Sequence, residues 1–202
     1  QLPQFLFNHL TDIDTHSVLN APLHPEVKKT PLVVFSHGIW GMRFQNTAQF
    51  EALASRGYIV LAVDHAYDAS LTIFNDGTIA DFRSGYEGEL SEDEFWALRN
   101  PQVKTRVADI NFMINTVAQK ADAQDPLWAA VDLQRIGMFG HSYGGATSIV
   151  AAHQDPRIDA TIVLDGWILP VPPKVIDQGV SSPILFIGRE TWPDPLNYQK
   201  LD

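Results

Sequence analysis

Short apolar runs alternate with amphipathic segments along this chain, which is typical of a parallel β-sheet flanked by helices. The runs are rich in β-branched and aromatic residues, as buried strands are. They occupy residues 32–36, 58–63, 136–139, 158–164 and 184–188. Helical periodicity appears between them, at residues 45–56, at 103–117 and in the small-residue run after Gly144. Strand, helix and strand joined by short links predict right-handed parallel units and therefore an α/β fold.

Residues 66–100 interrupt this alternation. Two apolar stretches flank Asp76-Gly77, a dipeptide that strongly favours a two-residue β-hairpin turn. The segment follows the carboxyl end of a strand, which is the edge where ligands bind in open α/β sheets. We therefore expect it to form a lid or a wall of the substrate pocket, with plain surface decoration as the alternative.

Capping signals predict where the helices begin. Ser91 followed by Glu94 has the form of a capping box and predicts a short helix. Asn100-Pro101 then predicts the start of a second, amphipathic helix, because proline is favoured at the first helical position. Residues 170–183 contain several prolines and are expected to form an irregular connection.

Composition narrows the class of protein. The 202 residues, 45% of them hydrophobic, are enough for a single domain with a sizeable core. No apolar run reaches the ~18 residues of a membrane span. A net charge of −10 argues against nucleic acid and anionic membranes as partners. The lack of cysteine excludes disulfides and thiolate metal sites. The chain begins at Gln1, so we expect processing or trimming at its front, and no signal peptide is visible. A secreted or periplasmic location is only slightly favoured over a cytoplasmic one.

The strongest functional motif lies within residues 135–152. The apolar run 136–139 meets the segment GHSYG (140–144) and then a small-residue helical run, which predicts a strand, a tight turn and a helix. Glycine has no Cβ to clash in such a turn, so the Ser142 hydroxyl is lifted clear of the backbone. The Tyr143 N–H lies at a helix N-terminus, where a developing oxyanion is stabilised. The five-residue string alone is weak, but this context predicts that Ser142 is a nucleophile.

A second glycine turn, HGIWG (37–41), follows the first predicted strand. Many hydrolases place their second oxyanion donor, a backbone N–H, in the loop after such a strand. We assign that donor to Ile39, with Trp40 as the alternate, and expect His37 to be structural. Taken alone, this segment would be interpreted as an ordinary glycine turn. The nucleophile predicted at Ser142 makes the oxyanion donor the better interpretation.

Asp165 is the best candidate for the acid of a catalytic triad. A serine needs a histidine to take its proton and a carboxylate to orient that histidine. In α/β-hydrolases these residues follow the chain order serine, acid, histidine, each after a strand. Asp165 ends the strand after the nucleophile helix, whereas Asp64 ends a strand that precedes the serine. Asp159 begins a strand and is therefore expected at the wrong edge of the sheet.

The histidine of the triad is missing from the expected place. All seven histidines, at positions 9, 16, 24, 37, 65, 141 and 153, precede Asp165. His141 should point away from Ser142. His153 should lie more than ~10 Å from Ser142, because it is three turns further along the helix. We expect the catalytic histidine on a segment after Asp202 or on a second chain of a nicked protein. The alternative is a hydrolase fold that has lost its chemistry.

The chain closely resembles the platelet-activating factor acetylhydrolase family of the plasma and isoform II type. The similar segments include VVFSHGIWGMR (33–43), LASRGYIVLAVDH (53–65), RIGMFGHSYGGAT (135–147) and IVLDGWILPVP (162–172). The resemblance implies a calcium-independent serine esterase with the α/β-hydrolase fold. It implies Ser142 as nucleophile, Asp165 as acid, and the N–H groups of Ile39 and Tyr143 as the oxyanion hole.

The resemblance also implies that the family's catalytic histidine follows the last strand of this sequence and that one or two strands precede residue 15, so that both ends of the fold are expected to be cut. Tyr143 stands where family members often have Phe, and residues 66–100 show no clear match. The substrate pocket is therefore the part that the resemblance describes least.

The expected reaction is ester hydrolysis through an acyl-enzyme on Ser142, with no metal or organic cofactor. The expected substrates are short-acyl esters, such as acetylated or oxidatively truncated phospholipids. Trp40, Trp167 and Phe74 are candidates for an apolar pocket lining, although each could equally belong to the core. Two other functions stay open: a general carboxylesterase or cutinase-like polyesterase, and a non-catalytic hydrolase-fold binding module.

Overall fold

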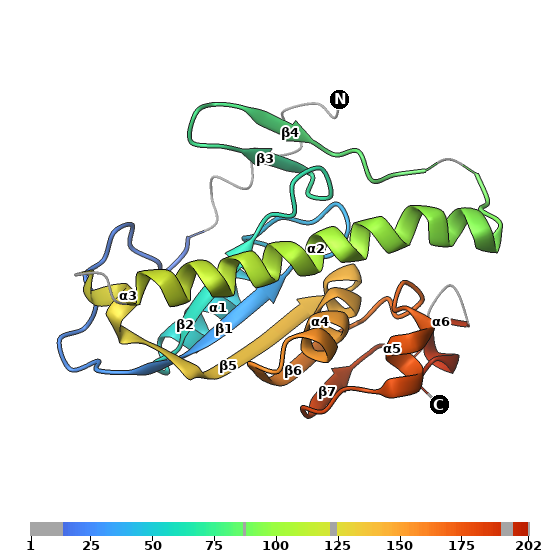
Figure 1. Ribbon diagram of the computed structural model, residues 1–202. Coiled ribbons are helices and arrows are strands. Elements are labelled where there is room, and N and C mark those ends of the chain that lie inside the picture. Colours follow the sequence, from blue (N-terminus) through green and yellow to red (C-terminus); the bar gives the residue numbers. More distant parts are fainter. Residues whose placement is uncertain (1–13, 87, 122–124, 191–195, 202) are drawn as a thin grey trace.

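A five-stranded parallel sheet forms the centre of the protein (Figure 1). The computed structural model describes residues 14–86, 88–121, 125–190 and 196–201. The spatial order of the strands is β2-β1-β5-β6-β7, and every neighbouring pair is parallel. The strands are β1 (Thr30–Ser36), β2 (Ile59–Val63), β5 (Val131–His141), β6 (Ile158–Leu164) and β7 (Ile184–Ile187). The strands predicted from apolar runs are confirmed, and β5 begins earlier than expected, directly after the short helix α3 (Pro126–Ala130).

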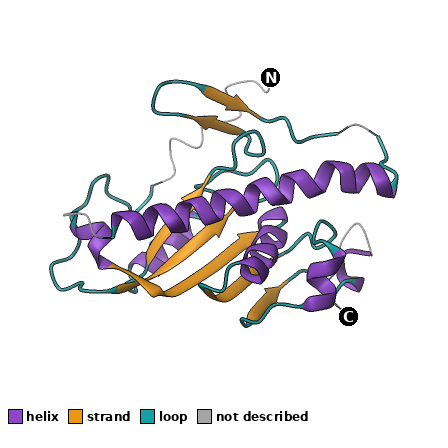
Figure 2. Ribbon diagram, in the orientation of Figure 1, coloured by secondary structure: helices purple, strands orange, loops and turns teal. Residues whose placement is uncertain are grey.

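Helices cover the two faces of the sheet unequally (Figure 2). Helices α2 (Glu92–Lys120) and α4 (Tyr143–Gln154) pack together over one face and bury the main hydrophobic core against β1, β5 and β6. Helix α1 (Thr47–Ala54) lies on the other face. No helix in the described ranges is long and apolar enough to cross a bilayer.

Helix α2 corrects the prediction of two separate helices. The capping box is present, because the Ser91 side chain accepts from the Glu94 N–H while the Glu94 side chain accepts from the Ser91 N–H. The helix does not stop there, however, and runs unbroken through Pro101 to Lys120. Proline removes one helical N–H donor, at a cost that packing can offset. The buried face that continues on both sides of Pro101 supplies that packing.

The segment after β2 forms the predicted hairpin. Strands β3 (Leu71–Ile73) and β4 (Ile79–Asp81) pair antiparallel on either side of Asp76-Gly77. The connection after β6 differs from expectation, because the proline-rich stretch contains a short helix, α5 (Pro173–Gln178). A last short helix, α6 (Leu196–Gln199), packs beside the end of β6, where the Asn197 amide bonds the Gly166 carbonyl at 2.9 Å.

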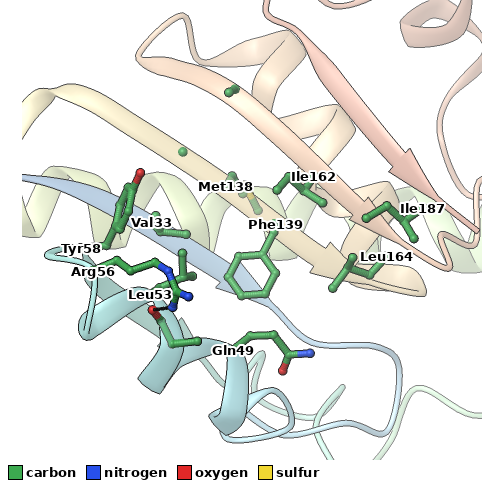
Figure 3. A pocket seen from close by; sticks show the side chains of 13 residues that line it. Val33, Gln49, Leu53, Arg56, Tyr58, Met138, Phe139, Ile162, Leu164 and Ile187 are labelled. Carbon is green, nitrogen blue, oxygen red and sulfur yellow. Dashed lines mark hydrogen bonds between the residues drawn. The ribbon is translucent and has the colours of Figure 1, made fainter.

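An apolar groove of about 630 Å³ lies on the same face of the sheet as helix α1 (Figure 3). Helix α1 forms one of its walls, and strands β5, β6 and β7 contribute side chains beyond the reach of the helix. The labelled lining residues are Val33, Gln49, Leu53, Arg56, Tyr58, Met138, Phe139, Ile162, Leu164 and Ile187. Within the described residues, helix α1 therefore covers this face of the sheet mainly over β1 and β2.

Arg106 is fully buried at the centre of a polar network that joins four segments of the chain. Its guanidinium donates to Asp68 at 3.1 Å, to the Thr147 hydroxyl at 3.0 Å and to the carbonyl oxygen of His37. A buried charge is costly unless its hydrogen bonds are satisfied, and here protein oxygens satisfy them. Helix α2 is thereby tied to α4, to the loop after β1 and to the loop after β2.

His65 extends this network in a Ser-His-Asp arrangement. The Ser36 hydroxyl lies 2.9 Å from His65 Nε2, and His65 Nδ1 lies 2.8 Å from an Asp109 carboxylate oxygen. Burial, and secondly the charge of Arg106, hold the pKa of His65 well below its ordinary value. His65 is therefore neutral, donates to Asp109 and accepts from Ser36. Because Ser36 and His65 are fully buried, this arrangement is closed to substrate.

Gly144 sets the distance between helix α4 and strand β1. A Cβ at this position would overlap the carbonyl oxygen of Ser36, a backbone atom that cannot turn aside. We predict that Gly144→Ala lowers the free energy of unfolding by more than about 3 kcal/mol in urea titrations. Gly137→Ala is the matched control, because a Cβ added there would have its nearest neighbours 3.9 Å away and should permit a change within about 1 kcal/mol. Equal stability of the two variants would contradict this packing.

Asp109 makes the stability of the protein depend on pH. Burial raises its pKa from 3.8 to about 6, against the opposing effect of Arg106. The folded state therefore holds this proton more tightly than the unfolded state, and the stabilisation is lost as pH rises through the folded pKa. We predict that the stability of Asp109→Asn relative to wild type increases between about pH 4 and about pH 7, and then levels off.

Urea titrations of both proteins across this pH range measure that difference, and Asp177→Asn, at an exposed position of α5, is the control. The asparagine oxygen can still accept from His65, so the network keeps its geometry. A stability difference that does not change with pH would contradict the assignment.

Candidate active site

Ser142 occupies a strained turn between β5 and α4. Its backbone has φ 53° and ψ −117°, a conformation that L-residues with a side chain rarely adopt. Three hydrogen bonds fix it: the Ser142 N–H donates to Leu164 O at 3.0 Å, and its carbonyl accepts from Gly145 at 2.9 Å and Trp167 at 3.0 Å. Within the described residues the Ser142 hydroxyl has no hydrogen-bond partner, and Ser142 lines a cavity. Backbone strain that the surroundings enforce in this way is characteristic of functional sites.

The loop after β1 passes directly over this turn. A Cβ on Gly38 would lie 3.1 Å from His141 Nδ1 and 3.3 Å from Ser142 Cβ, so glycine permits the close approach. The Trp40 N–H already donates to the carbonyl of Asp68 at 2.9 Å. The Ile39 N–H makes no hydrogen bond to any described residue, and Ile39 lines the same cavity as Ser142. Of the two expected donors, Ile39 therefore has the N–H that remains available.

Buried polar contacts hold this loop in place. His37 Nε2 accepts from the His65 N–H at 3.0 Å, and its Nδ1 lies 2.5 Å from the Gly38 carbonyl. Burial, with a further contribution from Arg106, lowers the pKa of His37 to about 3, so the ring is neutral. The Ser70 N–H donates to the Gly41 carbonyl at 3.0 Å. These contacts place His37 in a structural position, as the sequence suggested.

Tyr143 follows the serine and begins α4. The first N–H groups of a helix have no acceptor within the helix, so the Tyr143 N–H is available at the turn. Its ring is fully buried, 4.7 Å below the Arg106 guanidinium and 5.2 Å from the Trp167 ring. Burial raises the pKa of the phenol, which therefore stays protonated. The buried side chain thus anchors the turn at the start of α4.

Asp165 lies at the same edge of the sheet as Ser142. It directly follows Leu164, whose carbonyl accepts from the Ser142 N–H at 3.0 Å. Its backbone also has a positive φ, 46°, and its carboxylate lies 3.4 Å from Arg189 Nε. Asp159 lies at the opposite edge, where it accepts from the Ile136 N–H at 2.8 Å.

Asp64, the other carboxylate that follows a strand, is held away from the serine. Its two oxygens accept from the Arg43 N–H at 2.6 Å and from the Arg43 guanidinium at 2.9 Å. The structure therefore brings Ser142 and Asp165 to the same edge of the sheet, and it leaves Asp64 paired with Arg43.

No histidine in the described ranges hydrogen-bonds to Ser142. His141 Nδ1 instead accepts from the Gln45 amide at 2.7 Å, and burial lowers its pKa although Asp165 opposes this effect. His153 Nδ1 bonds the carbonyl of Gly179 at 2.7 Å, far along α4. His9 lies outside the described residues. The base that would activate Ser142 is thus not among the histidines that the structure describes.

A cavity of about 410 Å³ opens beside Ser142. It is lined by Ile39, Trp40, Phe82, Ser84, Gly85, Tyr86, Arg99, Ser142 and Trp167. Trp40 and Trp167 thus line the cavity, as predicted from the sequence. Phe74 is not in the lining, because it lies at the turn of the β3–β4 hairpin, where its N–H bonds the Thr78 carbonyl at 2.9 Å.

Sequence reasoning missed Phe82, Tyr86 and Arg99 as pocket residues. Segment 66–100 was expected as a pocket wall, and it does supply these side chains, but from after the hairpin rather than from its turn. Among the described residues, no group of three or more His, Asp or Glu side chains could hold a metal ion.

Comparison with known proteins relates this chain to esterases. The family described as "Platelet-activating factor acetylhydrolase, isoform II" matches residues 2–202. The platelet-activating factor acetylhydrolase of Canis lupus familiaris is 32% identical and covers 98% of this chain and 47% of its own length. A "Probable 1-alkyl-2-acetylglycerophosphocholine esterase" of Arthroderma benhamiae is 29% identical over 72% of this chain and 33% of its own length. The chain spans about half the length of the first of these relatives and a third of the second.

Solved structures show the same architecture. A ferulic acid esterase from Streptomyces cinnamoneus is 34% identical, with a TM-score of 0.73 over 92% of this chain and 50% of its own. A dienelactone hydrolase-like promiscuous phosphotriesterase, P91, from metagenomic libraries has a TM-score of 0.58 over 86% of this chain and 64% of its own, at 17% identity. This second likeness supports the α/β-hydrolase fold alone. The chain belongs to the platelet-activating factor acetylhydrolase isoform II family and has the α/β-hydrolase fold.

Proposed function

We propose that the chain carries the nucleophile, the acid and the oxyanion hole of a serine esterase that acts through an acyl-enzyme. The observation that carries the proposal is the Ser142 turn, strained at φ 53° and with a hydroxyl that bonds no described residue. That hydroxyl shares a cavity with Ile39, whose N–H is available. A strained serine between a strand and a helix, beside two available N–H groups, suits acyl transfer.

In this mechanism Ser142 attacks the ester carbonyl, and the Ile39 and Tyr143 N–H groups stabilise the tetrahedral oxyanion. Removing one such donor typically lowers the rate by ~10²–10³. Asp165 orients the imidazole that takes the serine proton and passes it to the leaving alcohol. Water then releases the acid from Ser142. The imidazole comes from outside the described residues, either from a further segment or from a second chain.

Short-acyl esters of the acetylated or oxidised phospholipid type are the proposed substrates. The support is family membership and the names of two relatives, an acetylhydrolase and an alkyl-acetylglycerophosphocholine esterase. A cavity of about 410 Å³ matches a small acyl or aryl group rather than two long chains. A general carboxylesterase is the second candidate, because the ferulic acid esterase is 34% identical and aromatic rings line the pocket here.

Covalent labelling of Ser142 distinguishes an esterase from a binding module with the same fold. The full-length protein is treated with an alkyl 4-nitrophenyl phosphonate, and mass spectrometry locates the adduct. We predict a single adduct on Ser142, which Ser142→Ala abolishes and Ser55→Ala, at an exposed serine, does not. A full-length protein that takes no label would favour the non-catalytic binding module.

Asp165 and Asp64 both follow strands, and their amide variants test which one serves the triad. We predict that Asp165→Asn lowers kcat on 4-nitrophenyl acetate by about 10³–10⁴, because the histidine then adopts the wrong tautomer. Asp64→Asn removes only the pairing with Arg43 and should leave kcat within about twofold of wild type. Equal loss in both variants would contradict the assignment of Asp165.

A further inference from the structure

Among the described residues that line the cavity beside Ser142, one is charged: Arg99. Arg99 comes from α2 and is only 2% exposed. Its guanidinium carbon lies 4.9 Å from the Trp167 ring, 5.2 Å from the Tyr86 ring and 5.7 Å from the Tyr143 ring. Aromatic residues therefore form a cage around a cation a short distance from the serine turn.

The hydrogen bonds of Arg99 are incomplete. Its Nη1 donates to Gln102 Oε1 at 2.6 Å and makes a long contact of 3.5 Å to the Ser84 carbonyl. Its Nε is buried and has no hydrogen-bond partner, and its Nη2 bonds no described residue. Among the described residues, no carboxylate lies within ion-pair distance of it. Buried donors without acceptors are rare in proteins and call for an explanation.

Arg106, two helical turns further along α2, shows what a buried arginine needs when it is purely structural. It is as buried as Arg99, but it has the Asp68 carboxylate at 3.1 Å and oxygen acceptors for its other nitrogens. A guanidinium offers a planar fork that fits the two oxygens of a carboxylate or phosphate. In Arg99 the edge of that fork formed by Nε and Nη2 has no acceptor among the described residues.

We propose that Arg99 is the anion-binding residue of the ester pocket, and that the preferred substrates carry a carboxylate or phosphate a few atoms from the scissile ester. The proposal rests on the proposed esterase function of this cavity. Both candidate sources present the same chemistry: a carboxylate at the end of a truncated acyl chain, or a phosphate on the alcohol side. The net charge of −10 strengthens the argument, because an anionic substrate gains nothing from the overall field and needs a local cation.

Matched ester pairs test this on the full-length protein. Mono-4-nitrophenyl glutarate against 4-nitrophenyl butanoate places a carboxylate on the acyl side. Acetyl glycerol 3-phosphate against monoacetylglycerol places a phosphate on the alcohol side. We expect wild type to prefer the charged member of one pair, and Arg99→Gln to lower kcat/KM for that member by about a hundredfold while the neutral member changes less than about threefold.

Two variants control for folding and for charge. Arg99→Lys keeps the charge without the planar fork and should fall between wild type and Arg99→Gln on the anionic ester. Arg83→Gln removes an exposed arginine of the same segment, which also faces a ring, Tyr67 at 4.5 Å, and pairs with Asp81 outside the cavity. It should change neither member of either pair. If Arg99→Gln fails to fold, the preference of wild type for the charged or the neutral member of each pair still tests whether the pocket selects an anionic substrate.

Calorimetric titration with glutarate and with glycerol 3-phosphate, which contain no ester, tests the site without turnover. We expect one of these anions to bind wild type and to lose that binding in Arg99→Gln. Hydrolysis of none of the four esters, together with anion binding at Arg99, would overturn the esterase function alone. Equal rates for charged and neutral members in wild type, or an equal loss for both in a folded Arg99→Gln, would overturn the anion-binding role.

Discussion

The contact between the start of helix α4 and the end of strand β1 constrains everything around the site. A Cβ at Gly144 would overlap the carbonyl oxygen of Ser36, so the lack of a side chain at Gly144 allows the helix to begin in contact with the strand. Ser142 is thereby held in its strained turn, and the loop that follows Ser36 is drawn over it through Gly38. Backbone packing thus brings Ile39 and Ser142 to one cavity, and the side chains of His37 and Arg106 hold the loop in place.

Much of this arrangement could be predicted from the sequence because its signals are local. Continuous apolar runs between glycines and prolines mark buried strands, and parallel topology gathers their carboxyl ends at one edge, so Ser142 and Asp165 had to be neighbours. Helix α2 shows where local signals mislead. Asn100-Pro101 has the chemistry of a helix start, and only the buried face on both sides of Pro101 decides that the helix continues.

The pocket was less predictable for a different reason. Phe74 and Phe82 each directly follow a strand of the same hairpin, but which of them lines the cavity with Ser142 depends on how the hairpin packs on the rest of the protein. The buried arginines of α2 did leave a signal. Arg99, Val103 and Arg106 follow at helical spacing along one face, so two cations share the apolar stripe of the helix. A charge in that position indicates a buried polar site rather than a solvated surface.

These two arginines divide their tasks along a single helix face. Arg106 is bonded to protein oxygens and holds the loop after β1, so its charge stabilises the geometry of the site rather than a ligand. Arg99 lies a further two turns toward the carboxyl edge, where the cavity opens, and keeps donors without acceptors. The net negative charge of the chain thus repels an anionic substrate, whereas the buried arginine attracts it. Under the role that we propose for Arg99, selection among esters takes place inside the cavity, because one nearby guanidinium outweighs many distant, screened surface charges.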